Sequence, residues 1–283
     1  MQTIKISKLS ALGVVAASIL ASASVSAECI NNFSKQGSVF TASTYRSNVA
    51  IANVSVESAV EQLRAIAIGK KMSVMSVDAA SGNMLIEQRE SGATRVIPML
   101  ISASNESGVT SIAMEVKLAR GMLAKADDVR TEICGMLSAI KAGTSVEQAA
   151  DAARLAAENA APESMDALDL SMKLARQAHT NQSTINPRYR GQRFTLSGKA
   201  AFIMEDGDGY NIGFDIPDRL DMALSPGPND PSYNVNLSCL MAPSETAYAL
   251  SVRERERIKL TGVFYKYDQF KKTAWLKDCK RAR

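Results

Sequence analysis

Residue types that commonly carry catalysis are scarce in this chain of 283 residues. It holds a single histidine, His179, a single tryptophan and four cysteines, and aromatic residues make up 5% of it. His179 is followed by Thr-Asn-Gln-Ser, a polar context that is typical of a solvated helix end. The sequence also lacks a Gly-x-Ser-x-Gly elbow and a glycine-rich phosphate loop. We therefore predict a protein that is not an enzyme and that needs no cofactor.

Beyond the N-terminus, no run approaches the ~20 consecutive apolar residues that a membrane-spanning helix needs. The first 27 residues differ from the rest, because Lys5 and Lys8 precede an apolar run over 9–20 and small residues end in Val25-Ser26-Ala27. These three regions are typical of a secretory signal peptide, so we expect cleavage after Ala27.

A lipid anchor at the new N-terminus is not expected. Lipoprotein signals place a small residue directly before the modified cysteine, whereas Glu28 precedes Cys29. We therefore expect a periplasmic or secreted protein without a transmembrane segment.

The four cysteines all lie after the expected cleavage site, and an even number in an oxidising compartment predicts two disulfides. Three pairings are possible, and we favour Cys29 with Cys134 and Cys239 with Cys279, because each pair then stays within one domain. A metal site is the alternative, but no two cysteines have C-x-x-C spacing and there is one histidine. No metal is therefore predicted.

The length of the chain predicts two domains after the signal peptide. Of the 15 aromatic residues in the sequence, 12 lie after residue 182, so the two halves are expected to have different cores. We predict an N-terminal domain over 28–142, a helical connector over 143–182 and a C-terminal domain over 183–283.

The N-terminal domain is predicted to be an antiparallel sheet with helices on one face, in the order β-α-β-β-β-β-α. Ser55 is a candidate N-cap for the first helix, and Gly69 is its expected end. This order is similar to that of helix-grip domains of exported bacterial proteins. The expected strands are 39–51, 72–77, 83–88, 94–102 and 109–118, and the second helix begins at Asp127 or Asp128.

The connector is rich in alanine and charge. Thr144 or Ser145 is expected to cap a helix that continues to Asn159, and a second helix should run over 163–178 after the interruption at Pro162. A spacer between the domains is the favoured interpretation. A helical hairpin that docks a partner is the alternative.

The C-terminal domain opens with Gln192–Met204, in which Phe194 to Phe202 alternate with polar residues at the period of a half-buried strand. Asp206-Gly-Asp-Gly209 then predicts a hairpin. Five strands with a helix between the third and the fourth, β-β-β-α-β-β, are expected, which is the order of an OB-fold barrel.

Short motifs in this domain resemble the tRNA_anti-like OB-fold family of bacterial extracytoplasmic proteins. They are Tyr189-Arg-Gly-Gln-Arg-Phe-Thr-Leu-Ser-Gly198, Cys239, Lys259-Leu-Thr-Gly262 and Leu276-Lys-Asp-Cys279. The resemblance covers about residues 186–280 and implies a five-stranded OB-fold barrel. It does not imply one activity, because OB domains bind unrelated ligands.

One stretch could hold a metal ion. Glu205 to Gly209, with Asp215, Asp218 and Asp221, is acidic, but Tyr210 stands where an EF-hand would have a ligand and no distal glutamate follows. A hairpin turn explains the stretch without a metal.

The usual ligand face of an OB-fold lies on its second and third strands. The alternation there predicts an outward set of Asn211, Asn234, Asn236 and Ser238. This set is polar and has no aromatic platform, which argues against nucleic acid but leaves oligosaccharide or peptide binding open.

A second contact patch is predicted from Tyr265, Lys266, Tyr267 and Lys271, which would suit an anionic polymer or lipid head group. The nearby run 253–259 alternates arginine and glutamate, and we expect a solvated edge with local ion pairing there. From these features we predict an exported binding protein that contacts a protein or an envelope component through its OB domain. An oligosaccharide or anionic-polymer binder is the alternative.

Export generates a direct test. The mature protein is expected to begin at Glu28 and to stay in solution without detergent, because the apolar run is too short to span a membrane. Mass spectrometry of the protein recovered from its native host gives the mass of the N-terminal peptide. Retention of residues 1–27, or a diacylglyceryl adduct on Cys29, would contradict the prediction.

Overall fold

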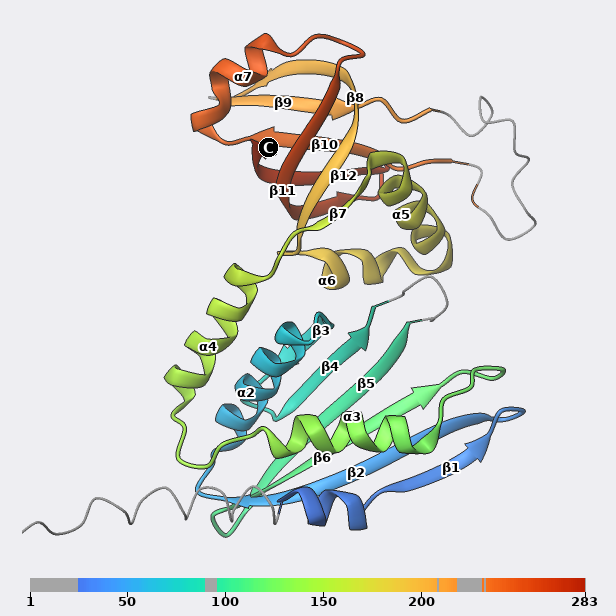
Figure 1. Ribbon diagram of the computed structural model, residues 1–283, viewed down its shortest axis with the longest axis vertical. Coiled ribbons are helices and arrows are strands. Elements are labelled where there is room, and N and C mark those ends of the chain that lie inside the picture. Colours follow the sequence, from blue (N-terminus) through green and yellow to red (C-terminus); the bar gives the residue numbers. More distant parts are fainter. Residues whose placement is uncertain (1–24, 90–95, 208, 218–230, 232, 283) are drawn as a thin grey trace, which may run out of the picture. The chain divides into compact units, whose positions relative to one another are not determined.

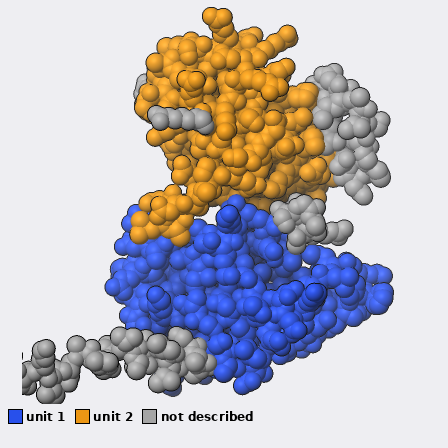
Figure 2. Space-filling model, in the orientation of Figure 1, with its two compact units in different colours: residues 1–154 blue, residues 155–283 orange. Residues whose placement is uncertain are grey.

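The computed structural model describes residues 25–89, 96–207, 209–217, 231 and 233–282. Most of the expected signal peptide and the residues Asp208, Asp218 and Asp221 lie outside the described ranges. The described chain is of mixed α+β type and forms two compact units, residues 1–154 and 155–283 (Figure 2). Each unit contains one six-stranded sheet.

The first unit is an antiparallel sheet in the order β1-β2-β6-β5-β4-β3, with α2 and α3 on one face (Figure 1). This arrangement confirms the predicted sheet with helices on one face. Its elements are β1 Ser34–Ser38, β2 Ala42–Ala52, α2 Val56–Gly69, β3 Ser73–Asp78, β4 Asn83–Gln88, β5 Ile97–Glu106, β6 Val109–Leu118 and α3 Ala126–Ser138.

The alternation of β2 explains which face is covered. Tyr45, Val49 and Ile51 are buried against the helices, whereas Arg46 and Asn48 between them are exposed. The α2 helix begins where the sequence predicts, because the Ser55 side chain accepts a hydrogen bond from the backbone N–H of Ser58 at 3.1 Å.

The strand predicted over 39–51 is wrong at its start. The chain forms β1 before it and turns at residues 39–41, so that β1 and β2 make a hairpin. β1 is exposed along its whole length, so it has no buried alternation by which the sequence could show it.

α4, Val146–Asn159, follows the first sheet and has a reciprocal cap at its start. The backbone N–H of Gln148 donates to Ser145 Oγ at 3.2 Å, and the backbone N–H of Ser145 donates to Gln148 Oε1 at 3.2 Å. Of the two candidates, Ser145 is therefore the cap.

The second half of the predicted connector needs a correction. Residues Glu163–Asp166 form strand β7, which pairs in parallel with β8, and the helix α5 begins only at Ala167. Leu170 and Leu174 of α5 are fully buried in the core of the second unit with Phe194. The helix is thus part of that unit, and its apolar stripe is covered by the sheet.

The second unit contains the remaining elements, which are α5 Ala167–Asn181, α6 Ile185–Tyr189, β8 Arg193–Asp206, β9 Gly209–Phe214, β10 Asn236–Met241, α7 Thr246–Ser251, β11 Arg257–Asp268 and β12 Thr273–Arg281. Its sheet has the order β11-β12-β10-β9-β8-β7, and β11 also pairs with β8. The hairpin predicted at Asp206 is present, since Asp206 pairs with Gly209.

Both predicted disulfides are present. Cys29 is bonded to Cys134 and Cys239 to Cys279, with Cα–Cα distances of 5.6 and 5.9 Å. The second bond crosses from β10 to β12, two strands that pair in parallel.

Gly262 makes room for this second disulfide. A Cβ atom at this position of β11 would lie 2.5 Å from Sγ of Cys279. The register between β11 and β12 shifts here, where Asp278 has a φ of 54° and forms a bulge. The bulge turns Cys279 inward beside Gly262, so the glycine and the cysteine depend on each other.

Replacing Gly262 with alanine tests this dependence. We expect Gly262→Ala to lower the free energy of unfolding of the second unit by ~1–3 kcal/mol, because the methyl group overpacks the disulfide. Urea denaturation measures the loss. Gly209→Ala is the matched control, since its Cβ would approach nothing closer than 3.9 Å. An equal loss in both variants would contradict the explanation.

Candidate functional site

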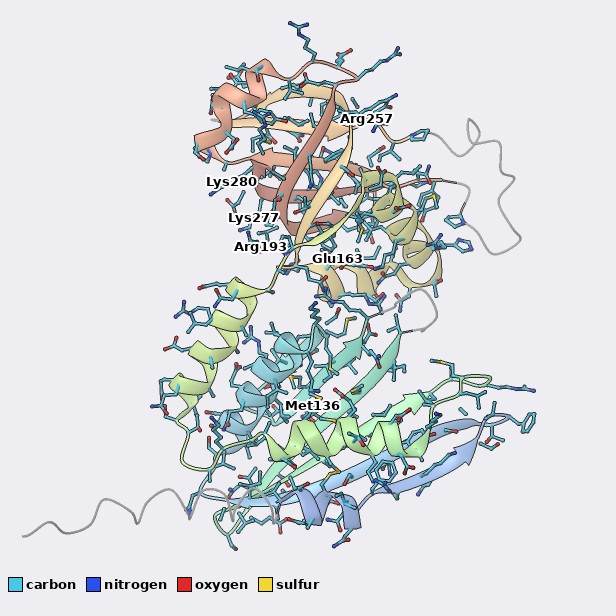
Figure 3. The ribbon with its side chains drawn as sticks, in the orientation of Figure 1. Met136, Glu163, Arg193, Arg257, Lys277 and Lys280 are labelled. Atoms are coloured by element: carbon cyan, nitrogen blue, oxygen red, sulfur yellow. A yellow bond between two sulfur atoms is a disulfide. The ribbon has the colours of Figure 1, made fainter. Side chains whose placement is uncertain are left out.

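Six cations share one outer surface of the second unit. They are Arg193 and Lys199 of β8, Arg257 and Lys259 of β11, and Lys277 and Lys280 of β12, and all six are exposed. We call them the basic face. Figure 3 labels four of them, and their long side chains project outward from the three strands.

The strand register places these side chains next to one another. Lys199 lies opposite Arg257 on the paired strands β8 and β11. Val263 lies opposite Arg193 on one side and Lys277 on the other, so those two cations flank it. Opposed residues in a sheet point to the same side, so the cations form rows across three strands.

A hydroxyl pair in the middle of the basic face confirms this orientation. Thr195 and Thr261 lie opposite each other, and their Oγ1 atoms are 2.7 Å apart in a hydrogen bond. Lys280 is the next residue in the same row, opposite Thr261 on β12. The inner sides of the same strands carry Leu196 and Leu260, which are fully buried.

Few of these charges are neutralised by neighbours. Lys277 has a weak pair with Asp278, at 3.9 Å between two exposed side chains, and an Arg193 N–H donates to the backbone oxygen of Glu158 at 3.5 Å. Lys199, Arg257, Lys259 and Lys280 form no ion pair within the described residues. Exposed pairs of this kind contribute ~0–1 kcal/mol, so the positive field of the face is largely uncompensated.

Among the described residues, the run 253–259, in which arginine and glutamate alternate, does not form the ion pairs that its sequence predicted. Local ion pairing was predicted, but Glu256 accepts a hydrogen bond from the backbone N–H of Arg253 at 2.9 Å and, in the described chain, makes no ion pair with an arginine of the run. Arg257 and Lys259 belong to β11 and extend over the sheet instead.

Of the predicted contact patch, Tyr265 adjoins the basic face and Tyr267 does not. Tyr265 is 44% exposed, and the ammonium groups of Lys266 and Lys277 lie 5.6 and 5.7 Å from its ring centre. Lys266 is also exposed, and Lys271 lies in the exposed turn after β11.

Tyr267 is buried, against the prediction that it faces outward. A bulge at Tyr265 shifts the register between Phe264 and Lys266, so the residues after it exchange faces. The backbone N–H of Tyr267 donates to Asn186 Oδ1 at 2.7 Å. Burial raises the pKa of the Tyr267 hydroxyl above its ordinary value.

The predicted polar face of the second and third strands is not formed. Asn211 and Ser238 are 2% and 3% exposed, although Asn236 is exposed. Asn234 is half-buried, and its side-chain amide donates to the backbone oxygen of Pro217 at 2.7 Å.

Phe202 is one reason why the predicted polar face is not formed. A register shift between Ala200 and Phe202 turns Phe202 to the outer side, where it lies opposite Gly213. Its ring occupies the space in which a Gly213 side chain would lie, since a Cβ there would be 2.3 Å from the ring. Ser238, which pairs with Gly213, is next in this row.

Trp275 also lies on the outer side. It is half-buried and lies opposite Ser238, while Leu276 beside it is fully buried. The bulge at Asp278 explains why Trp275 and Cys279 face opposite sides although they are four positions apart.

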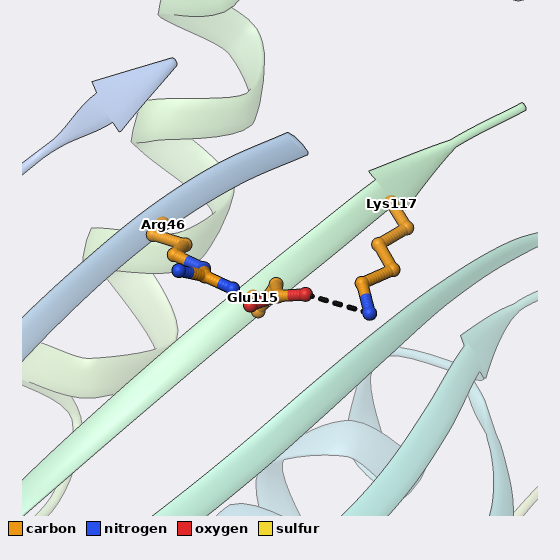
Figure 4. A network of polar contacts seen from close by, with 3 residues as sticks. All are labelled: Arg46, Glu115 and Lys117. Carbon is orange, nitrogen blue, oxygen red and sulfur yellow. Dashed lines mark hydrogen bonds and ion pairs between the residues drawn. The ribbon is translucent and has the colours of Figure 1, made fainter. Parts of the chain in front are cut away.

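A separate charged network lies on the open face of the first sheet. Glu115 of β6 is in contact with Arg46 of β2 and, at 2.9 Å, with the ammonium group of Lys117 (Figure 4). The hydrogen bond from Lys117 is the main reason why the pKa of Glu115 lies below its ordinary value. Each of the two cations in this network contacts the carboxylate, which distinguishes them from those cations of the basic face that form no ion pair in the described chain.

Comparison with known proteins assigns this chain to no family. The chain matches no known protein-family pattern and no curated protein sequence. Among solved structures, a conserved protein of unknown function from Enterococcus faecalis is similar at 7% identity and a TM-score of 0.31, over 51% of this chain and 98% of that one. Fission yeast Pot1 with single-stranded DNA is similar at 10% identity and a TM-score of 0.23, over 91% and 88%. Both TM-scores are too low to support an argument.

The buried Asn211 generates a prediction. Its Oδ1 atom is buried without a hydrogen-bond partner among the described residues, which costs ~1–3 kcal/mol. Asn211→Val removes this oxygen and suits a strand. We expect the free energy of unfolding of the second unit to rise by ~1 kcal/mol, measured by urea denaturation. A fall in stability would show that the amide has a partner in solution.

Proposed function

We propose that this chain is an exported, non-enzymatic binding protein whose C-terminal unit contacts an anionic component of the bacterial cell envelope through the basic face. The observation that carries the proposal is the set of six exposed cations on β8, β11 and β12, four of which have no ion pair in the described chain. An anionic polymer that repeats phosphate or carboxylate groups would match these rows of charge.

We further propose that the C-terminal unit is an OB-fold barrel. Neighbouring strands pair in the order β8, β9, β10, β12 and β11, and β11 pairs with β8 again, which is the neighbour order that such a barrel requires. The helix α7 lies between the third and fourth of these strands along the chain. In this proposal the ligand binds beside the first, fourth and fifth strands rather than on the second and third.

Export is supported by the cysteines, because both disulfides join residues that lie after the expected signal peptide. None of the described helices is long and apolar enough to cross a membrane. We propose that the mature protein lies in the periplasm or outside the cell, where the envelope polymers are accessible to it.

The chemistry of the face favours charge recognition over a reaction. Threonine hydroxyls and Tyr265 accompany the cations, and the hydroxyl groups of these side chains can donate hydrogen bonds to phosphate or carboxylate oxygens. Arg193 and Arg257 can do so with two parallel N–H groups, whereas the lysines act as point charges.

The test replaces three central cations together. We expect the variant Arg257→Gln, Lys259→Gln, Lys280→Gln to bind labelled inorganic polyphosphate ~100-fold more weakly than the wild type at low salt, at ~1 kcal/mol for each cation. Fluorescence anisotropy measures the affinity. The wild-type affinity should also fall steeply between 25 and 150 mM NaCl, since salt screens exposed charges.

The matched control removes the same charge elsewhere. Lys71→Gln, Lys141→Gln, Arg176→Gln alters three exposed cations outside the basic face and should keep most of the affinity. If both triple variants lose binding equally, net charge rather than the face is responsible. If neither loses it, the proposed function is wrong.

A further inference from the structure

Two large apolar side chains project from one end of the first unit. Phe40, in the turn between β1 and β2, is 79% exposed, and Leu123, in the loop between β6 and α3, is 80% exposed. The loops adjoin, because the backbone N–H of Gly121 donates to the backbone oxygen of Val39 at 2.9 Å. We call these two side chains the apolar tip.

The loops that carry the apolar tip are held in place. Met122 and Ala124, on either side of Leu123, pack against the core of the unit, and the Tyr45 hydroxyl donates to the backbone oxygen of Ala124 at 3.2 Å. In the β1–β2 turn, the backbone N–H of Thr41 donates to the oxygen of Ser38 at 3.1 Å. The tip is thus presented by ordered backbone, which reduces the entropy lost on binding.

The two segments that carry the tip contain cations and no acids. Lys35 lies on β1, and Arg120 and Lys125 flank Leu123 in its loop; all three are exposed and none forms an ion pair within the described residues. The segments 34–42 and 119–125 contain no aspartate or glutamate. Two loops that are far apart in the sequence therefore present two apolar side chains together with three positive charges.

We infer that the apolar tip inserts into an anionic lipid bilayer surface, with Phe40 and Leu123 in the acyl boundary and Lys35, Arg120 and Lys125 against the head groups. A stable protein interface buries ~800 Å² on each partner around a packed centre, which two side chains on protruding loops do not provide. A bilayer accepts such side chains singly, and the cations add attraction to anionic lipids.

This site does not depend on the proposed function, since it lies in the other unit and combines apolar contact with charge. A weak, reversible attachment is expected, because two inserted side chains and three cations are far less than a membrane-spanning helix. Such attachment would hold the protein at the membrane without a lipid anchor.

Sedimentation with vesicles tests the inference on the full mature chain. We expect binding to phosphatidylglycerol-containing vesicles and at least ~10-fold weaker partitioning of Phe40→Ser, Leu123→Ser, because each side chain loses ~1.5 kcal/mol or more of apolar burial. The control Leu155→Ser, Leu250→Ser removes two other exposed leucines, 49% and 62% exposed, and should bind as the wild type does. Vesicles of phosphatidylcholine alone should bind the wild type more weakly than the anionic vesicles do.

A second measurement reports insertion directly. The sequence has one tryptophan, so Trp275→Phe combined with Phe40→Trp gives a chain whose only indole lies at the tip. Its emission should shift to the blue on addition of anionic vesicles and be quenched by lipids brominated on their acyl chains. An unshifted, unquenched spectrum, or equal partitioning of the double-serine variant and the wild type, would overturn the inference.

The two sites can be separated by crossing the experiments. The double-serine variant should still bind polyphosphate, and the triple variant of the basic face should still show the blue shift at the tip. Loss of vesicle binding in the triple variant but not in the double-serine variant would assign the lipid contact to the basic face and refute the tip. If the triple variant loses only its binding to polyphosphate and still binds vesicles, the inference about the apolar tip holds.

Discussion

The second unit depends on one long strand that changes its partners. β8 runs over 14 residues, and its first half pairs with β7 and with β11, whereas its second half pairs with β9. The change occurs at the register shift between Ala200 and Phe202. A bulge there bends the strand and increases its twist, which allows one strand to serve both ends of the sheet.

The two halves of β8 have different surfaces as a result. Before the shift, the outward residues include Arg193 and Lys199, whose register adds the cations of β11 and β12. After the shift, Phe202 lies over Gly213, and the adjoining Ser238 is buried. One strand thus carries both the exposed cations and the covered surface around Phe202, and the position of the bulge decides where an anionic ligand has access.

Much of the fold could be predicted from the sequence because local chemistry determined it. Ser55 caps α2, β6 has the expected ends, Asp206 begins the hairpin, and the disulfide pairing follows from the division of the chain. The strand β7 could not be predicted, because its four residues are too few to show an alternation of their own. They also directly precede a helix whose Ala and Leu residues form one apolar stripe.

The site was less predictable for one physical reason. A period of two assigns faces correctly only while the register holds, and each single-residue bulge exchanges the faces of all residues after it. The bulges at Tyr265 and Ala201 moved Tyr267 and Phe202 away from their predicted sides. The cations of β8 and β11 lie before the bulges of their strands on regular segments, whereas Lys277 and Lys280 lie on either side of the bulge at Asp278. The alternation in 257–261 was a usable clue to the basic face.

The bond between Cys29 and Cys134 has a further meaning for the first unit. It joins a residue near the expected mature N-terminus to α3, the helix that follows the sheet, across a sequence separation of 105. All six strands of the first sheet lie between these two cysteines in the sequence. A protease that cuts any one loop between Cys29 and Cys134 therefore leaves both fragments covalently joined, and in an oxidising compartment the cut unit can refold around the same core.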